Sequence, residues 1–201
     1  MNGESEMSNT SRIAEIVGLM PPHDGAGYVA DWMSMERAWG LSFPNDFKAF
    51  VAAYGDGSME NYLAVLVPEE AGGEPAGDVA DTTDDARATW EETGPPPGSS
   101  DSPEQLVAWG ADGTGDLLCW LTEGGDPDQW PVAVYHRGYD AWRIYPCSMT
   151  DFLYRMFCGE WDEHPLSGTP LWGNRSPRFL THEMARSIRQ RGGEPWPEAQ
   201  N

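Results

Sequence analysis

Two carboxylates in the segment GGDPDQW could take part in acid–base chemistry. Asp126 and Asp128 flank Pro127, and paired carboxylates can serve as general acid and general base when their environments separate their pKa values. The Gly and Pro residues around them indicate an exposed turn, in which nothing removes either carboxylate from water. An acid-dependent hydrolase is therefore the third hypothesis for this chain, and neutralising Asp112, Asp116, Asp126 or Asp128 would abolish its activity.

A second acidic turn runs from Asp112 to Asp116 with the sequence DGTGD. Oxygen ligands at alternating positions suit a calcium ion, but the turn lacks the third spaced carboxylate and the bidentate carboxylate of a complete calcium loop. Asp-Gly pairs are also what a tight turn between two strands requires. We expect a structural turn here rather than a metal site.

The sequence carries no other motif of an enzyme. Cys119, Cys147 and Cys158 are odd in number and lack CxxC spacing, so they indicate neither a disulfide framework nor a zinc site. We expect them to be reduced core residues. A Gly-rich phosphate loop followed by Lys, a GxSxG turn and an HExxH motif are also absent from the sequence. The sequence therefore predicts a protein without catalytic residues, metal or cofactor.

Net charge gives the clearest indication of a partner. The chain has 33 Asp and Glu against 12 Lys and Arg, a formal net charge of −21, and Lys48 is its one lysine. Phosphate binding depends on basic patches, so this charge excludes nucleic acid as the expected partner. An acidic surface favours a basic protein partner, although a high net charge by itself also keeps a protein soluble.

Membrane association is not indicated either. The sequence contains no apolar run of about 18 residues, the length needed to cross a bilayer. The first residues, MNGESEMSNTSR, lack the basic start and the apolar core of a signal peptide. We therefore expect a cytoplasmic protein.

Two helices and a strand are predicted in the first third of the chain. The first helix ends at Gly40 and has one apolar face, made of residues at spacings of three and four: Tyr28, Trp32, Met35 and Trp39. Pro44 suits the first turn of a second helix, which is expected to end at Gly55. The apolar residues 62–67 are typical of a short strand that ends before Pro68.

Residues 69–104 form an acidic region between these elements and the rest of the chain. The region holds eleven acids against one base, Arg87, with Gly72-Gly73 near its start and GPPPGSS near its end. We expect an exposed insertion. Within it, residues 81–92 could form one short helix capped by Asp81-Thr82.

The remainder of the central region predicts a sheet and a closing helix. Residues 105–109, 117–121, 131–135 and 141–145 are short strand-like runs separated by Gly and Asp turns, which favours an antiparallel meander. Residues 149–159 then form an amphipathic helix with Ser148 or Thr150 available as its cap. That helix would pack on the sheet.

Two terminal segments are expected outside a central domain of residues 25–165. Residues 1–24 predict a mobile arm or a weak leading helix. Residues 166–201 form an extension with an amphipathic, Arg-rich segment at 179–191. From residue 175 onward the chain has five Arg and three Glu, a net charge of +2. We expect this segment to fold back on the acidic body, with binding to a membrane surface as the weaker alternative.

Several of these segments together resemble the SUKH superfamily. The resemblance begins with a helix bearing Trp and Glu, then WGLSFPNDFKAFVAAYGDGSME and an apolar strand. Downstream, LVAWGADGTGDLLCWL, WPVAVYHRGYDAWRIYP and SMTDFLYRMFCGEW resemble the rest of the family pattern. The resemblance covers roughly residues 27 to 161. It implies a single α+β domain with an antiparallel sheet of about four to six strands packed against helices.

The resemblance also implies a function. Fungal members of the superfamily act in cell-wall signalling, and bacterial members are mostly immunity proteins. We therefore expect a non-catalytic immunity protein that binds and neutralises a cognate secreted toxin, such as a nuclease. The second hypothesis is a regulatory interaction scaffold like the fungal relatives. Long low-complexity arms would favour that scaffold, and this chain has only short ones.

The family supplies no fixed binding motif, so the candidate binding residues come from the acids of this chain and one aromatic residue at an element edge. Carboxylates would steer a basic partner, and an exposed aromatic side chain would supply affinity. The candidates are Glu69, Glu70, Asp78, Asp81, Asp84, Asp85, Asp112, Asp126, Asp128 and Trp130.

Overall fold

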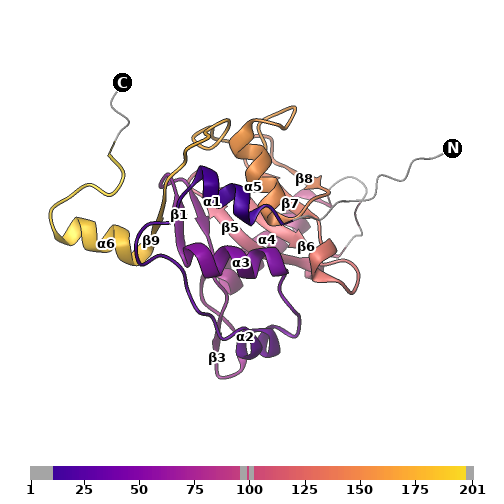
Figure 1. Ribbon diagram of the computed structural model, residues 1–201. Coiled ribbons are helices and arrows are strands. Elements are labelled where there is room, and N and C mark those ends of the chain that lie inside the picture. Colours follow the sequence, from indigo (N-terminus) through magenta and orange to yellow (C-terminus); the bar gives the residue numbers. More distant parts are fainter. Residues whose placement is uncertain (1–10, 96–98, 100–101, 198–201) are drawn as a thin grey trace.

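A computed structural model describes residues 11–95, 99 and 102–197 of the chain. Its main sheet has seven strands in the order β8-β7-β6-β5-β2-β1-β9, and every neighbouring pair is antiparallel (Figure 1). The strands are β1 (Gly57–Met59), β2 (Leu63–Val65), β5 (Leu106–Asp112), β6 (Leu117–Leu121), β7 (Val132–His136), β8 (Ala141–Tyr145) and β9 (Phe179–Thr181). The α+β architecture expected from the sequence is confirmed. The sheet is wider than the expected four to six strands because β1 and β9, of three residues each, join its edge.

Three helices cover one face of the sheet: α1 (Ile13–Leu19), α3 (Asn45–Tyr54) and α5 (Met149–Cys158). Alternate residues of a strand point to opposite faces, so Trp109 of β5 and Trp120 of β6 enter this core. The ring of Phe47 meets that of Trp120 edge-on, with 4.9 Å between centroids. Ser148 caps α5 by accepting a hydrogen bond from the backbone N–H of Asp151. It is one of the two cap residues that the sequence predicted.

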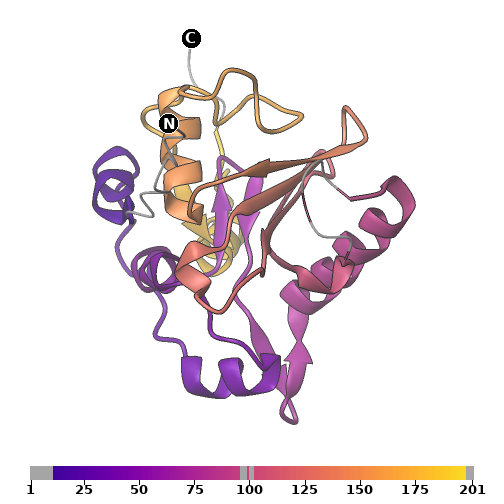
Figure 2. The same ribbon diagram turned by 90° about the vertical axis from the view of Figure 1, so that its right-hand side faces the viewer.

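The opposite face is covered by α4 (Gly77–Thr93), which Figure 2 shows on the other side of the sheet from α1, α3 and α5. Its buried residues recur at helical spacing: Val79, Thr83, Ala86 and Trp90. The expected helix at 81–92 therefore exists, but it begins at Gly77 rather than after an Asp81 cap. The insertion is also not simply exposed, because Trp90 packs against Trp142 with 5.3 Å between ring centroids.

One end of the molecule is formed by α2 (Trp32–Trp39) and a separate hairpin of β3 (Glu69–Ala71) and β4 (Glu74–Ala76). The indole N–H of Trp39 donates to the carbonyl of Glu69 over 3.2 Å. The helix begins at Trp32, since the Asp31 side chain accepts from the backbone N–H of Ser34 at its start. Tyr28, expected on the buried face of this helix, precedes it and is 47% exposed.

The described part of the expected N-terminal arm packs on the domain. Ile16 and Met20 are fully buried, and Tyr54 donates its hydroxyl to the carbonyl of Met20 over 2.6 Å. The backbone N–H of Arg12 donates to the Thr150 hydroxyl over 3.0 Å. Of the two predictions for this segment, the leading helix is confirmed by α1, whereas residues 11–20 are not an arm, because their apolar side chains recur at helical spacing and fit against α3 and α5. Residues 1–10 lie outside the described part.

The C-terminal segment expected at 179–191 divides into β9 and α6 (His182–Gln190). A Cβ at Gly57 would lie 2.3 Å from the carbonyl oxygen of Leu180, so glycine lets β9 pair closely with β1. The Thr181 side chain caps α6 by accepting from the backbone N–H of Met184 over 3.1 Å. Figure 1 shows α6 extending away from the body of the molecule.

Two 3-10 turns, Pro103–Gln105 before β5 and Pro127–Gln129 before β7, complete the described elements. None of the helices in the described ranges is long and apolar enough to cross a membrane.

Candidate functional site

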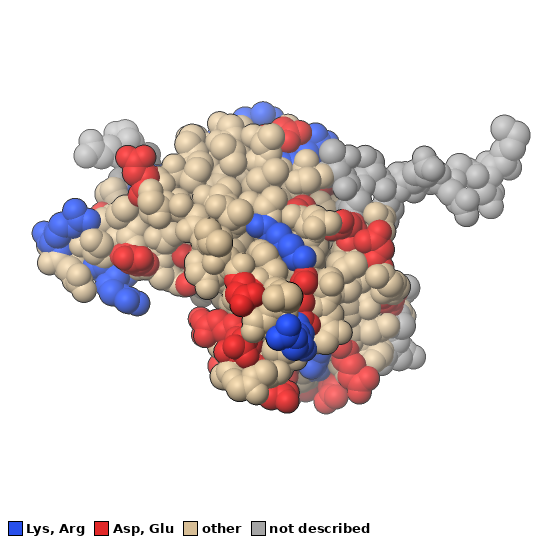
Figure 3. Space-filling view, turned by 60° about the horizontal axis from the view of Figure 1, so that its bottom comes forward, with Lys and Arg blue, Asp and Glu red and all other residues tan. Residues whose placement is uncertain are grey.

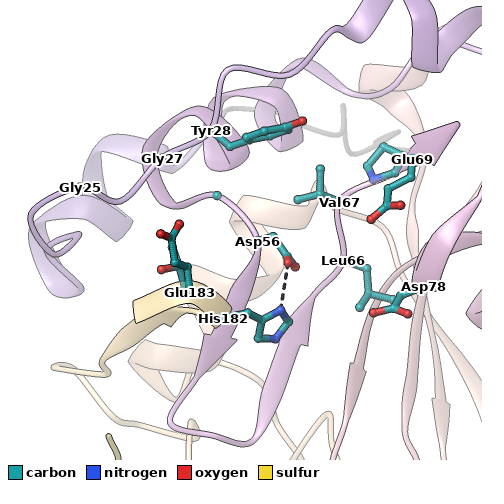
Figure 4. Close-up of a pocket in the computed structure, with 13 residues that line it drawn as sticks. Gly25, Gly27, Tyr28, Asp56, Leu66, Val67, Glu69, Asp78, His182 and Glu183 are labelled. Carbon is teal, nitrogen blue, oxygen red and sulfur yellow. Dashed lines mark hydrogen bonds and ion pairs between the residues drawn. The ribbon is translucent and has the colours of Figure 1, made fainter. Parts of the chain in front are cut away.

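A cleft of about 340 Å³ opens where the ends of α3, β2 and β9 meet the start of α4. Its walls come from the loop before α2, the turn after α3, residues 66–69 after β2, and the first residues of α6. In Figure 4, Glu69 and Asp78 approach this opening from one side and Glu183 from the other.

The cleft is acidic. Four carboxylates line it, those of Asp56, Glu69, Asp78 and Glu183, and the described lining contains no Lys or Arg. His182 is the one residue of the lining that can carry a positive charge near neutral pH. A concave surface lined by charges of one sign concentrates the electrostatic field, so this cleft attracts cations.

The Asp56 and His182 side chains pair across the cleft floor (Figure 4). The Nδ1 atom of His182 lies 2.9 Å from Oδ2 of Asp56. This hydrogen bond raises the pKa of His182 above its ordinary value, and the negative charges of Asp56 and Asp78 act in the same direction, while partial burial opposes them. The pair therefore holds the start of α6 against the turn after α3.

Two glycines allow the wall opposite α6 to approach α3 closely. Gly27 has φ of +93°, and a Cβ there would lie 2.5 Å from the carbonyl oxygen of Ala52. Gly55 has φ of +76°, and a Cβ there would lie 3.4 Å from the backbone of Gly27. The next residue, Tyr28, donates its backbone N–H to the carbonyl of Val51 over 3.1 Å. The loop is thus fixed to α3 by its backbone.

The acids of the hairpin and of α4 form an exposed surface that continues from the cleft, and we name it the acidic face. It consists of Glu69, Glu70, Glu74, Asp78, Asp81, Asp84 and Asp85, all exposed. The face exists because the buried side of α4 holds its apolar residues against the sheet, which leaves the aspartates on the solvent side.

The acidic face has few internal ion pairs. Among the described residues, one of its seven carboxylates, that of Asp84, lies within 4.0 Å of a base, the guanidinium of Arg87. The same guanidinium donates hydrogen bonds to the backbone carbonyls of Glu104 and Leu106, each over 3.1 Å. Figure 3 shows many acidic side chains over the end of the molecule that bears α2 and the hairpin, with a few basic side chains among them, and the basic side chains of α6 well apart.

Six of the ten predicted binding residues are therefore brought together on the acidic face: Glu69, Glu70, Asp78, Asp81, Asp84 and Asp85. The other four lie elsewhere.

Asp112 lies at the other end of β2, since it pairs with Leu63 at the start of that strand, whereas Glu69 follows its end. Its Oδ1 accepts from the backbone N–H of Thr114 (2.8 Å) and of Asp116 (3.0 Å), so the expected structural turn is confirmed.

The turn before β7 uses its two aspartates to fix its own geometry. Asp126 accepts from the backbone N–H of Asp128 over 3.1 Å. The Asp128 carboxylate accepts from the backbone N–H of Asn45 (2.7 Å) and from its side-chain amide (2.6 Å), which joins this turn to the start of α3. The two carboxylates thus shape their own turn and attach it to α3.

Trp130 is 5% exposed and belongs to the main core. The prediction that it is partly exposed is wrong, because it leads directly into β7, whose five residues are all buried.

Sequence reasoning missed Tyr28, Asp56, His182 and Glu183 of the cleft. Asp56 had a signal, since glycines on both sides of an acid allow close approach of other backbone segments. His182 and Glu183 reach the cleft through the pairing of β9 with β1, which joins residues more than a hundred positions apart. No local pattern indicates that pairing.

Asp116, Ser167 and His136 form a cluster that has the residue types of a hydrolase triad in a different order. Asp116 is fully buried and accepts from the Ser167 hydroxyl (2.5 Å) and from the backbone N–H of Arg137 (2.7 Å). Nδ1 of His136 lies 3.2 Å from that hydroxyl. In a triad the histidine stands between the acid and the nucleophile, whereas here the serine does. The cluster therefore joins the β7–β8 turn to the loop after α5.

The three cysteines are free, with Cys119 and Cys147 buried. Burial raises the pKa of the Cys119 thiol, and it raises the pKa of Cys147 to about 12, so neither supplies a thiolate near neutral pH. Among the described residues, no group of three or more His, Cys, Asp or Glu is placed to hold a metal ion.

A family model described as SMI1-KNR4 cell-wall, SUKH_6, matches residues 30–153, which is more than half of the 201 residues. The chain belongs to the SUKH superfamily. No curated protein and no solved structure matches it.

The SUKH match covers only some of the residues that line the cleft. It runs from the residues just before α2 into α5, so Asp56, Glu69 and Asp78 lie within it. The wall with His182 and Glu183 comes from β9 and α6, which follow the matched residues, and the loop wall with Tyr28 precedes them. The acidic face lies wholly within the SUKH match.

Proposed function

We propose that this SUKH protein is a cytoplasmic immunity protein that binds a basic secreted toxin through the acidic face and the adjoining cleft. The observation that carries the proposal is the seven exposed carboxylates of the acidic face, of which, among the described residues, Asp84 alone forms an ion pair, with Arg87. The other six carboxylates keep their charge available for an external cation. Membership of the SUKH superfamily supports the immunity role.

The negative charge of the acidic face suits a toxin that acts on nucleic acid. A nuclease presents a basic cleft that accommodates phosphates. A surface dense in carboxylates can occupy such a cleft, and opposite charges accelerate the encounter of the two proteins. The four carboxylates of the 340 Å³ cleft would receive a Lys or Arg side chain from the toxin.

The proposed inhibition is non-catalytic. Support comes from the groups that could otherwise react, because the Cys119 and Cys147 thiols are buried and the Ser167 hydroxyl donates to Asp116. Asp126 and Asp128 accept hydrogen bonds that shape their own turn. The protein would then block the toxin by occupying its active or substrate site.

The test begins with capture at low salt on the immobilised chain and elution by a salt gradient. A basic protein recovered in this way is expressed in a bacterial host with and without the chain, and growth is followed. The proposal predicts that the recovered protein arrests growth and that the chain restores it. The double variant Glu69→Gln/Asp78→Asn should restore growth poorly, whereas Glu160→Gln/Asp162→Asn, with the same charge change at two other exposed sites, should restore it fully.

The alternative function is a regulatory interaction scaffold. The description of the matching family as SMI1-KNR4 cell-wall supports this alternative. Recovery of several signalling or cell-wall proteins, none of them toxic, would support the scaffold and contradict the immunity proposal.

A further inference from the structure

Three exposed apolar side chains lie in the loop before α2 and in its first turn, and the first of them, Tyr28, lines the cleft. Four large hydrophobic residues are exposed in the described part of the chain, and three of them lie within six positions: Tyr28 at 47%, Val29 at 98% and Met33 at 71%. Single exposed apolar residues are ordinary on protein surfaces, whereas a cluster of them marks an interaction site. We name these three residues the apolar patch.

The backbone of the apolar patch is held at both ends. Tyr28 donates its N–H to Val51 in α3, and Gly27 before it fits against the carbonyl of Ala52. Asp31, two residues after Val29, caps α2, and Met33 lies in the first turn of that helix. Ordering an interface side chain costs less entropy when its backbone is already fixed, so these residues are suited to act as binding anchors.

The apolar patch is continuous with the acidic site. Tyr28 itself lines the cleft together with Glu69, as Figure 4 shows. The helix that carries Met33 contacts both strands of the acidic hairpin, and the Trp39 side chain donates to the Glu69 carbonyl over 3.2 Å. An apolar centre bordered by charge is the usual arrangement of a protein interface.

Charge decides which occupant fits this combined surface. A second copy of the chain would bring another acidic surface against this one, and like charges repel. Anionic membranes attract basic segments beside apolar residues, whereas here the neighbouring cleft is acidic. A basic protein that presents an apolar side chain between Lys and Arg residues satisfies both parts of the surface.

We propose that the apolar patch is the affinity anchor of the toxin-binding surface and receives an apolar side chain that basic residues flank on the partner. This inference rests on the proposed function and specifies the chemistry of the partner. The acids would set the rate of encounter, and the patch would set the lifetime of the complex.

Two lysine-rich peptides of equal length and charge test the inference, one carrying leucines where the other carries serines. Each is titrated at low salt into the full ¹⁵N-labelled chain, and binding is followed by amide shifts. We expect the leucine peptide to bind about tenfold more tightly, as burial of one such side chain allows, with the largest shift differences at the apolar patch. Val29→Ser/Met33→Ser should abolish the leucine advantage and leave serine-peptide binding unchanged.

Tyr139→Ser is the matched control, since Tyr139 is 62% exposed but lies in the turn before β8; it should keep the leucine advantage. Equal binding of the two peptides, or an advantage that survives in Val29→Ser/Met33→Ser, would overturn the anchor inference while the acidic site stands. Failure of both peptides to bind would overturn the acidic site as well. The chain could instead self-associate or bind zwitterionic vesicles. If Val29→Ser/Met33→Ser abolished either interaction, the patch would be assigned to that other occupant and the anchor inference would be overturned.

Discussion

His182 is the cleft residue whose charge responds to pH near neutrality. It is placed by β9 and paired with Asp56, with Asp78 also near enough to favour its protonated form. Its protonation state therefore affects both the attachment of α6 and the net charge that a basic partner meets. At lower pH the cleft carries an added positive charge, which would oppose binding of a cation.

The pKa of His182 should fall when its partner is neutralised. Because this pKa is raised in the folded chain, the pairing stabilises the fold fully below the ordinary value of 6.5, and the contribution is lost as pH rises through the raised pKa. NMR titration of the His182 ring protons should show a lower pKa in Asp56→Asn. Glu183→Gln serves as the control and should leave the pKa close to that of the unmodified chain. An unchanged pKa in Asp56→Asn would contradict the pairing.

Asp116 should prove to be a structural residue. Its carboxylate accepts from the Ser167 hydroxyl, from the Ser167 backbone N–H and from the Arg137 backbone N–H. Asp116→Asn replaces one acceptor with a donor and leaves a buried N–H without its partner, so unfolding free energy should fall by about 1–3 kcal/mol. Urea denaturation measures this loss, and Asp162→Asn at the exposed surface should show none. Equal stability of the two variants would show that the cluster does not secure the fold.

At the scale of elements, the strongest local signals predicted the structure well. The runs 117–121 and 141–145 coincide with β6 and β8. The helix expected after Pro44 occupies Asn45–Tyr54, as Pro and Gly mark its two ends. The acids from residue 69 to 85 are close in sequence, so a local hairpin and one helix suffice to gather them. That part of the candidate site was readable from the chain.

Elements that depend on distant partners were not readable. β1 and β9 have three residues each, and they become strands because β1 pairs with β2 on one side and with β9 on the other. The burial of α4 depends on the small side chains of Ala108 and Ala133 on the facing strands. Tyr28 shares the helical spacing of Trp32 and Trp39 but lies before the Asp31 cap, and the cap determines where the helix begins. The cleft wall formed by α6 was therefore unpredictable.

The loop wall of the cleft should be sensitive to one glycine and not to its neighbour. Gly27 and Gly25 both have positive φ, +93° and +81°, but a Cβ at Gly25 meets nothing within 4 Å, whereas one at Gly27 meets the Ala52 carbonyl at 2.5 Å. Gly27→Ala should lower the unfolding free energy by about 1–3 kcal/mol more than Gly25→Ala, since only Gly27 adds a backbone clash to the strained φ. Thermal unfolding and the amide shifts of Asp56 and Tyr28 measure the two effects. Equal losses in the two variants would show that the close approach of this loop to α3 contributes nothing.

At the scale of the whole molecule, charge is unevenly distributed. Residues from 175 onward carry a net charge of +2 within a chain of −21, and α6 holds much of this positive charge apart from the acidic face (Figure 3). The acidic face is formed within the SUKH match, while the loop with Gly27 and Tyr28 and the start of α6 line the cleft from outside it. The common domain thus supplies the acidic face, and segments before and after the match complete the cleft beside it.

The central claim is that the acidic face and its cleft bind a basic partner, and the association rate across a salt series tests it most directly. With the captured partner, the unmodified chain should associate fast at low salt and more slowly as salt rises. Glu69→Gln/Asp78→Asn should slow association about tenfold at low salt and flatten the salt dependence, whereas Glu160→Gln/Asp162→Asn should remain within about twofold of the unmodified chain. Equal slowing by both double variants would show that net charge alone governs binding, and salt-independent association would show that the acidic face is not the binding site.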